Sequence, residues 1–350
     1  MWKIEIIQDW NKIWEPVFQA KWLKIMAESP NAHVFFHPAL IKAWEQALRA
    51  SKPLKPLFII GTEDNSNIEV IFPLVFWCQN WKNAFQKQIV PIGANDFDYH
   101  DPVFSKTVNE ETMQSFYHTL LPLLPDCDVI RFDGLHKKYM PQSFEIRSET
   151  LCPYFHIESF STIEDYTKTL KKSFVSDYVR TTKRLTEKYG PVSTRFYSSN
   201  EMETALCQLD KMLEIHRKRW PKAYKVPHFH ANLLKEGLTN QVLLFAETSV
   251  ENQPVAWYIC FIYKEKLMLY MPAIVPEFQV YSPGKINLLA CVNYAIENRL
   301  KMVDHLKGDE SYKRIWANQE DTVYDVEMKS KALVSRIKES LLILKKKYLK

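Results

Sequence analysis

Glycine is scarce in this sequence, and its few occurrences stand far apart. The seven glycines are Gly61, Gly93, Gly134, Gly190, Gly237, Gly284 and Gly308. This spacing excludes the GxGxxG, GxxxxGK and GxSxG patterns, each of which needs two glycines within a few residues. The chain therefore has no dinucleotide-binding fingerprint, no Walker phosphate loop and no nucleophile elbow.

Cysteine pairs and long apolar runs are also missing. The six cysteines lie far apart without a CxxC pair, which argues against a zinc site or a disulfide framework and favours free thiols in a reducing compartment. The segment of residues 1–14 is already charged at Lys3, Glu5 and Asp9, unlike a signal peptide. No apolar stretch reaches the roughly 18 residues of a membrane span. We expect a cytoplasmic protein without a metal ion.

Apolar residues are abundant, and charge is unevenly shared. The chain of 350 residues is 46% hydrophobic and 25% charged, which is enough apolar mass for a core. Its length suggests two domains or one large one. Residues 1–150 carry 15 Lys and Arg against 18 Asp and Glu, whereas residues 151–350 carry 31 against 23. The second half is therefore the better candidate for holding an anion.

The two halves repeat one order of elements: three strands, a polar loop, a helix, and a strand that ends near a glycine. In the first half the helix is expected at 111–124 and the last strand at 128–132; in the second half they are expected at 285–297 and 302–306. The order predicts an α/β protein of the α+β type, with two related units, each a mostly antiparallel sheet flanked by helices. Chance similarity of two α/β layers is the alternative. The predicted domains are 1–150 and 151–330, followed by a basic helix at 331–350.

The segment Gln279-Val-Tyr-Ser-Pro-Gly284-Lys285 is the first candidate for binding. A Ser-Pro-Gly turn that opens a helix offers backbone N–H groups at the positive end of the helix dipole, which suits a pyrophosphate. Lys285 adds a positive charge at the same place. The alternative is a plain helix start, since Pro-Gly is also common there.

The segment Gly308-Asp-Glu-Ser-Tyr-Lys313 gathers two carboxylates, a phenol and an ammonium at the end of a strand. A carboxylate can take a proton from an attacking amine, and Lys313 can keep its partner acid ionised or meet an anion. The alternative is a pair of acidic residues that favour the first turn of a helix, and we prefer that interpretation for Asp309.

These motifs together resemble a known family. The chain is similar to the GNAT-type acetyltransferase domain of proteins associated with cellulose and exopolysaccharide biosynthesis, which are relatives of the Fem-type aminoacyl transferases. The similarity rests on short motifs in the expected order over nearly the whole chain. They are Phe36-His37-Pro38 with Trp44, Tyr99 with Asp101-Pro102, His216-x-x-Arg219-Trp220, Tyr281-Ser-Pro-Gly284, and Asp304 with Gly308-Asp-Glu310-x-Tyr312-Lys313 and Trp316.

The resemblance implies two GNAT-like folds, of which the second holds acyl-coenzyme A, with acetyl-coenzyme A as the first candidate. The acyl group would pass directly to an amine of a sugar, an amino acid or a related metabolite, either free or carrier-linked. The GNAT pyrophosphate loop corresponds to Gln279-x-x-Ser282-x-Gly284, with serine in place of the first glycine and Pro283, which has no N–H, between. The implied donor-binding residues are Gln279, Tyr281, Ser282, Gly284 and Lys285.

The resemblance also assigns roles in the reaction. Glu310 is the base or substrate orienter, Tyr312 the acid to the leaving thiolate, and strand amides at 271–273 the oxyanion donors, with Asp309 beside them. The implied acceptor-side residues are His216, Arg219, Trp220, Tyr99, Asp101 and Lys313. For residues 216–220 the alternative is that cations simply favour a helix C-terminus. His228 and His230 have metal-like strand spacing but no third ligand in register, so we predict no metal.

Two basic regions keep other functions open. Residues 168–188 hold seven Lys and Arg against two acids, which fits transfer RNA or a solvated amphipathic face that buries Phe174, Tyr178 and Leu185. The first alternative function is therefore an aminoacyl-transfer-RNA-dependent, Fem-like transferase. The second is a non-catalytic GNAT-fold module in polysaccharide synthesis, suggested by Ser282 and Pro283. The terminal lysines indicate a solvated tail helix or a contact with an anionic surface.

Overall fold

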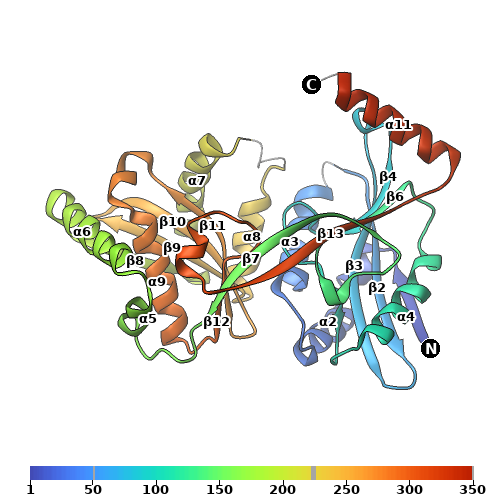
Figure 1. The fold of residues 1–350 in the computed structure, drawn as a ribbon, viewed down its shortest axis with the longest axis horizontal. Coiled ribbons are helices and arrows are strands. Elements are labelled where there is room, and N and C mark those ends of the chain that lie inside the picture. Colours follow the sequence, from blue (N-terminus) through green and yellow to red (C-terminus); the bar gives the residue numbers. More distant parts are fainter. Residues whose placement is uncertain (50–51, 222–225, 349–350) are drawn as a thin grey trace. The chain divides into compact units, whose positions relative to one another are not determined.

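The computed structural model describes residues 1–49, 52–221 and 226–348. They form two compact units: unit 1 consists of Met1–Thr150 with Thr322–Lys350, and unit 2 of Leu151–Asp321 (Figure 1). The predicted fold class is confirmed, because each unit is a mostly antiparallel sheet flanked by helices. Within the described residues, no helix is both long enough and apolar enough to cross a bilayer.

Unit 1 is built on the strand order β1-β2-β3-β4-β6-β13-β7, with β5 beside β3. Its strands are β1 (Trp2–Ile7), β2 (Leu54–Glu63), β3 (Ile68–Cys78), β4 (Lys87–Pro91), β5 (Val103–Phe104), β6 (Val129–His136), most of β13 (Gln319–Lys329) and the first half of β7 (Glu145–His156). Its helices are α1 (Trp10–Ile13), α2 (Pro16–Glu28), α3 (Pro38–Arg49), α4 (Glu110–Leu120) and α11 (Leu333–Tyr348), with short 3-10 turns η1 (Val34–Phe36), η2 (Trp81–Asn83), η3 (Leu121–Leu123) and η4 (Lys137–Tyr139). An aromatic core, which includes Trp22 against Phe58 at 4.6 Å, fills the space between sheet and helices.

Unit 2 continues from the second half of β7 in the order β7-β12-β11-β10-β9-β8. Its other strands are β8 (Val192–Tyr197), β9 (Leu243–Val250), β10 (Gln253–Tyr263), β11 (Lys266–Ile274) and β12 (Met302–Asp304). Its helices are α5 (Ile163–Thr169), α6 (Lys172–Tyr189), α7 (Met202–Arg219), α8 (Phe229–Thr239), α9 (Pro283–Glu297) and α10 (Lys313–Trp316), with η5 (Ser199–Glu201) and η6 (Pro276–Tyr281). Helix α9 packs on β9, β10 and β11, α7 packs on β11, and α8 on β9.

The predicted repeat of elements is present in both units. Unit 1 has β2-β3-β4, then α4, then β6; unit 2 has β9-β10-β11, then α9, then β12. In each unit the two strands that flank the helix are paired in parallel, β4 with β6 and β11 with β12, while the preceding strands are antiparallel. A parallel pair needs such a crossover, and a helix is its usual form.

Two local predictions were wrong. The helix expected from Asn11 to Glu28 is split into α1 and α2, because Pro16 has no N–H for a continuous helix and instead occupies the first turn of α2. The loop expected at 136–152 contains the start of β7. The first residues of β7 are polar and mostly exposed, so they show none of the alternation that marks a half-buried strand.

Candidate functional site

The site begins where one strand of a parallel pair stops and its neighbour continues. Met268 of β11 pairs with Asp304, the last residue of β12, and β11 then runs on to Ile274. We call this place the fork. The pairing of β11 with β10 shifts at Tyr270, which is a bulge of the kind that bends a strand and re-aims its amides. The amides expected as oxyanion donors lie in this stretch. Pro272 has no N–H, so the candidates are the amides of Met271 and Ala273.

The loop after β12 is held by a buried lysine. The Lys313 ammonium donates to the Lys307 carbonyl at 2.6 Å and pairs with the Glu310 carboxylate at 3.0 Å; its side chain is only 7% exposed. Gly308 closes the same loop with φ 132°, and a Cβ there would overlap the Glu310 carboxylate. The predicted Glu310 and Lys313 are thus brought together, with Lys313 holding Glu310 in place. Asp309 forms an ion pair with Arg314 and is exposed.

Tyr312 lies beside this loop and reaches a buried tyrosine on the sheet. Its side chain shares a hydrogen bond with Tyr258 of β10, which is 3% exposed. Burial raises the pKa of Tyr312 to about 12, the Glu310 charge acts in the same direction, and the bond with Tyr258 and the charge of Arg219 oppose it. Tyr312 therefore remains protonated at neutral pH and is able to donate a proton.

His305, directly after β12, is a residue that the sequence alone did not single out. It is 1% exposed, and neither ring nitrogen has a hydrogen-bond partner within the described residues. Burial, with a smaller contribution from the charge of Lys313, lowers its pKa to about 3. Buried polar atoms without partners are rare and are often found where a ligand or water binds. Tyr258 was also missed, because a tyrosine in a hydrophobic strand is indistinguishable from core.

The N-terminus of α9, expected to seat the donor, is partly occupied by the protein itself. Ser282 adopts a left-handed conformation with φ 53°, and its carbonyl accepts the Lys285 amide at 2.9 Å. The Lys285 ammonium pairs with Asp177 of α6 at 2.6 Å. Hydrogen bonds from Lys285 and then Arg180 lower the pKa of Asp177. Because the Lys285 ammonium is already paired with the Asp177 carboxylate, an anion that binds at this helix end must compete with Asp177 for it.

The other predicted donor residues have separate environments. Tyr281 is 6% exposed and packs edge-on against Tyr189 at 5.6 Å. A hydrogen bond from Lys188 lowers the pKa of Tyr281. Gln279 is exposed, and Gly284 lies so close to Ile274 that a Cβ would come within 2.6 Å of its Cδ1 atom. Gly284 is thus needed for the close approach of α9 to the end of β11.

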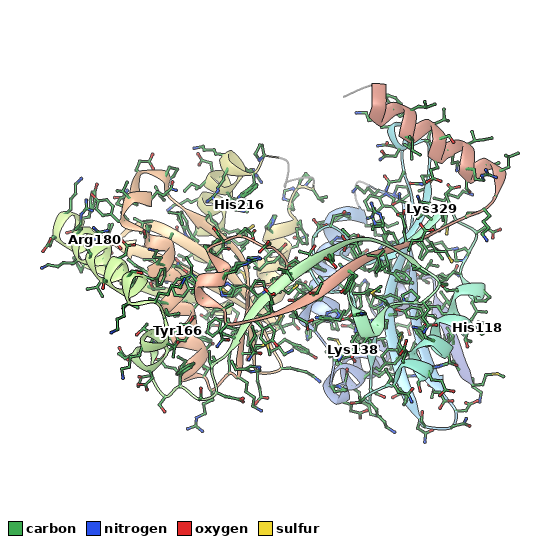
Figure 2. All side chains as sticks on the ribbon, viewed as in Figure 1. His118, Lys138, Tyr166, Arg180, His216 and Lys329 are labelled. Atoms are coloured by element: carbon green, nitrogen blue, oxygen red, sulfur yellow. The ribbon has the colours of Figure 1, made fainter. Side chains whose placement is uncertain are left out.

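The structure brings the predicted acceptor-side residues together only in part. His216, near the end of α7 (Figure 2), has its pKa lowered to about 4 by burial and by the charge of Arg219. His230 of α8 also has a pKa of about 4, lowered by burial and then by His216 and Arg217. Arg219 stacks on Trp220 at 5.7 Å and acts electrostatically on Tyr312. The end of α7 therefore lies close enough to the fork for the Arg219 charge to act on Tyr312.

Tyr99 and Asp101 lie inside unit 1 instead. Asp101 is 3% exposed and accepts hydrogen bonds from the His136 amide at 2.8 Å and from the His136 ring at 2.5 Å. Tyr99 is 6% exposed, with its ring 5.2 Å from that of His136. In this structure both residues hold the loop between β4 and α4.

No metal centre is found in the part of the chain that the structure describes, where no group of three or more His, Cys, Asp or Glu gathers. The strand spacing inferred for His228 and His230 was wrong. His228 caps the N-terminus of α8 in a left-handed conformation, and His230 lies in the first turn of that helix.

Comparisons with known proteins give one family match and several similar folds. Residues 172–314, all in unit 2, match the family model of the acetyltransferase (GNAT) domain. The chain is similar to the solved structure of FemX, at 8% identity and a TM-score of 0.62, over 97% of this chain and 100% of that one. It is similar to a conserved protein of unknown function from Bacteroides thetaiotaomicron VPI-5482 (10% identity, TM-score 0.56, 93% and 100% covered).

A further similar structure is the C-terminal domain of an Agrobacterium fabrum protein described as a lysylphosphatidylglycerol synthetase (6% identity, TM-score 0.50, 87% and 96% covered). At such identities the likeness concerns the fold alone. None of the curated proteins matches the chain. The expected GNAT domain in the second half and the Fem-like fold are thereby confirmed.

Proposed function

We propose that the chain is an N-acyltransferase that moves an acyl group, with acetyl as the first candidate, from acyl-coenzyme A to an amine. The observation that carries the proposal is the placement of Tyr312. This side chain lies at the fork of the matched GNAT domain, is hydrogen-bonded to buried Tyr258, and has a pKa raised to about 12. A group that donates a proton to a thiolate must be protonated at neutral pH, and this one is.

The reaction is direct transfer in a single site. The amine nitrogen attacks the thioester carbonyl, Glu310 takes the proton that the nitrogen loses, and the new C–N bond replaces the C–S bond. Tyr312 gives its proton to the departing thiolate. The amides of Met271 and Ala273 stabilise the charge on the carbonyl oxygen. Lys313 holds Glu310 in position through their 3.0 Å contact.

The cysteines are consistent with this chemistry. None of the six described cysteines forms a disulfide, and those that are buried (Cys152, Cys260, Cys291) lie in the hydrophobic core. Burial raises the pKa of Cys260 well above its usual value, which disfavours a nucleophilic thiolate. A covalent acyl-enzyme is therefore not part of the proposal, and a reducing cytoplasm is the expected compartment.

Donor binding is tested first, by calorimetry with acetyl-coenzyme A. We expect saturable binding that is lost in Gly284→Val, because the new side chain meets Ile274 at the seat of the donor. Glu297→Val, at the exposed far end of the same helix, is the matched control and should bind normally. Failure of every acyl-coenzyme A tested to bind the wild-type protein would overturn the proposal.

Turnover is tested next, with amino sugars, amino acids and carrier-linked amines as acceptors. These include amine-bearing precursors of cellulose and other exopolysaccharides, which the motif resemblance suggests. With a confirmed acceptor, Glu310→Gln should lower kcat about 100-fold or more, as for other general bases. If Glu310→Gln turns over as fast as the wild type, the base has been assigned to the wrong residue.

A transfer-RNA-dependent activity is the second candidate, because one helix presents many cations. Exposed basic side chains of α6 and the residue before it are Lys171, Lys172, Arg180, Lys183, Arg184 and Lys188, with Arg180 labelled in Figure 2. The same helix buries Leu185 fully and Phe174 and Tyr178 partly, as the amphipathic interpretation predicted.

A gel shift with aminoacyl-transfer RNA separates the two functions. Reversal of Lys171, Lys172, Arg180 and Arg184 abolishes a specific complex, whereas reversal of four exposed lysines of unit 1 (Lys3, Lys12, Lys55 and Lys106) leaves it intact. A complex that both variants weaken equally reflects net charge alone. If neither donor binds, a non-catalytic role in polysaccharide synthesis becomes the better explanation.

A further inference from the structure

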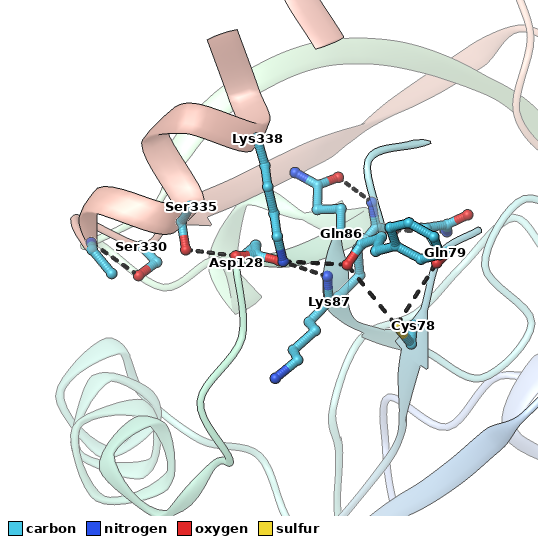
Figure 3. Close-up of polar contacts among 11 residues, drawn as sticks. Cys78, Gln79, Gln86, Lys87, Asp128, Ser330, Ser335 and Lys338 are labelled. Atoms are coloured by element: carbon cyan, nitrogen blue, oxygen red, sulfur yellow. Dashed lines mark hydrogen bonds and ion pairs between the residues drawn. The ribbon is translucent and has the colours of Figure 1, made fainter. Parts of the chain in front are cut away.

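The last helix of unit 1, α11, is attached to its unit by polar contacts. The Asp128 carboxylate accepts Ser335 at 2.6 Å and Lys338 at 2.8 Å, and Lys338 also donates to the Phe85 carbonyl at 3.3 Å (Figure 3). Burial acts to raise the pKa of Asp128, but the bonds from Lys338, Ser335 and the Lys87 amide outweigh it and lower the pKa. The side of α11 that faces its unit thus carries the polar residues Ser335 and Lys338, together with half-buried Leu342.

The apolar side of α11 faces solvent. Val334, Ile337, Leu341 and Leu344 follow the spacing that places residues on one stripe of a helix, and they are 63%, 52%, 54% and 51% exposed. Leu333, at 71%, continues the stripe. A helix of a globular domain normally turns such a stripe to the core, so this arrangement leaves an apolar surface without a cover in the described part of the chain.

Two exposed aromatic side chains adjoin the helix. Trp81 and Phe85, in the connection between β3 and β4, are 69% and 59% exposed. Lys345 of α11 donates to the Lys82 carbonyl at 2.7 Å and lies 6.0 Å from the Trp81 ring. We call the docking face the set Trp81, Phe85, Leu333, Val334, Ile337, Leu341 and Leu344.

The charge around the docking face identifies its partner. Residues 331–350 contain seven Lys and Arg against one acid, Glu339, which is itself paired with Lys329 at 2.7 Å. A second copy of α11 would bring the same positive charge to the contact, and like charges repel. An anionic lipid surface offers apolar depth for the stripe and negative headgroups for the lysines.

We propose that the docking face binds a membrane surface rich in anionic phospholipid, with α11 lying in the plane of the headgroups. Charged side chains such as Arg336, Lys338 and Lys345 are distributed along α11, so the helix is suited to lie on the surface rather than to cross the bilayer. Trp81, exposed beside the helix, is of the residue type that membranes favour at the level of the headgroups. Each Lys or Arg near such a surface increases binding about fivefold, so binding weakens steeply with salt.

The test is co-sedimentation of the whole chain with two kinds of vesicle, phosphatidylcholine alone and phosphatidylcholine mixed with phosphatidylglycerol. We expect binding to the mixed vesicles only. Ile337→Gln with Leu341→Gln should weaken it at least tenfold, since two large apolar side chains no longer enter the bilayer. The matched control is Val17→Gln with Leu23→Gln on α2, where both side chains are exposed in the same unit.

Each possible result supports or overturns membrane binding by the docking face. No binding to mixed vesicles, or equal binding to both kinds, overturns the proposal. So does equal loss in the α2 control, which would show general hydrophobicity. Concentration-dependent dimers in light scattering that vanish in the α11 variant, without vesicle binding, would make the face an interface between two copies. Circular dichroism confirms that the variants are folded; their altered side chains are exposed, so folding should be unaffected.

Discussion

Unit 1 and unit 2 share an order of elements, yet they differ at the equivalent place. In unit 1 the loop between β4 and α4 folds inward, and Asp101 with His136 forms a buried pair there. In unit 2 the connection between β11 and α9 is the short turn η6, and Glu310 and Tyr312 beside the fork stay partly exposed. The comparison teaches that the same topology buries its polar residues in unit 1 and leaves them accessible at the proposed site of unit 2.

The largest expected effect distinguishes the two units by chemistry. Tyr312→Phe removes the proton donor and should lower kcat about 100-fold or more while the protein stays folded. Tyr139→Phe in unit 1, another tyrosine whose pKa is raised by burial, is the control and should leave kcat unchanged. Steady-state kinetics with acetyl-coenzyme A checks both. Equal loss in the two variants would mean that the difference between the units is not catalytic.

A second change should affect stability rather than activity. Asp101→Asn weakens the hydrogen bonds that the buried Asp101 carboxylate accepts from His136 and should lower the free energy of unfolding by about 1–3 kcal/mol. Because Asp101 lies inside unit 1, kcat should not change. Denaturant unfolding and kinetics on the same preparation measure the two quantities. A loss of kcat without a loss of stability would instead place Asp101 at the substrate, as the motif resemblance implied.

Acid should destabilise both units through their buried histidines. Burial lowers the pKa of His37 in unit 1 to about 4 and that of His305 in unit 2 to about 3. The unfolded chain takes up these protons first, near pH 6.5, so stability falls as the pH is lowered from there toward the folded values. At pH 5 each histidine costs about 2 kcal/mol.

The histidine effect is measured by unfolding at pH 7 and pH 5. His37→Gln and His305→Gln should each reduce the loss of unfolding free energy between pH 7 and pH 5 by the contribution of the histidine that is removed. If His305→Gln alone also alters the KM for donor or acceptor at pH 7, the unpartnered ring at the fork binds substrate. An unchanged pH slope in both variants would contradict the burial of the two rings.

The smallest expected effect concerns the donor seat. Asp177→Asn removes the carboxylate that pairs with Lys285 and leaves the ammonium for an incoming pyrophosphate. The exposed position of Asp177 limits the gain to a few-fold in acetyl-coenzyme A affinity, in line with pairs near a surface. Asp165→Asn on α5, which pairs with Lys168, is the control. Weaker binding in Asp177→Asn would mean that the pair positions Lys285 for the donor.

Much of the fold was predictable from the sequence, because periodicity and breakers act locally. The order of strands and crossover helices in both units follows from alternating apolar runs, from Pro38 at a helix start and from glycines near the ends of the last strands. The polar start of β7 was not predictable, since its partners are strands far away in the chain. The site was partly predictable, because Glu310, Tyr312 and Lys313 lie within four residues of one another.

The amino-acid sequence by itself determined the class of fold, the GNAT-like motifs and the excess of positive charge in the second half. Only the tertiary structure decided which of these residues work together. In the folded protein Tyr312 is hydrogen-bonded to Tyr258 and His305 is buried. Lys285 forms an ion pair with Asp177, and Asp101 is buried inside unit 1. The physical reason is that burial and pairing depend on contacts between distant segments, whereas propensity and periodicity depend on neighbours in the chain.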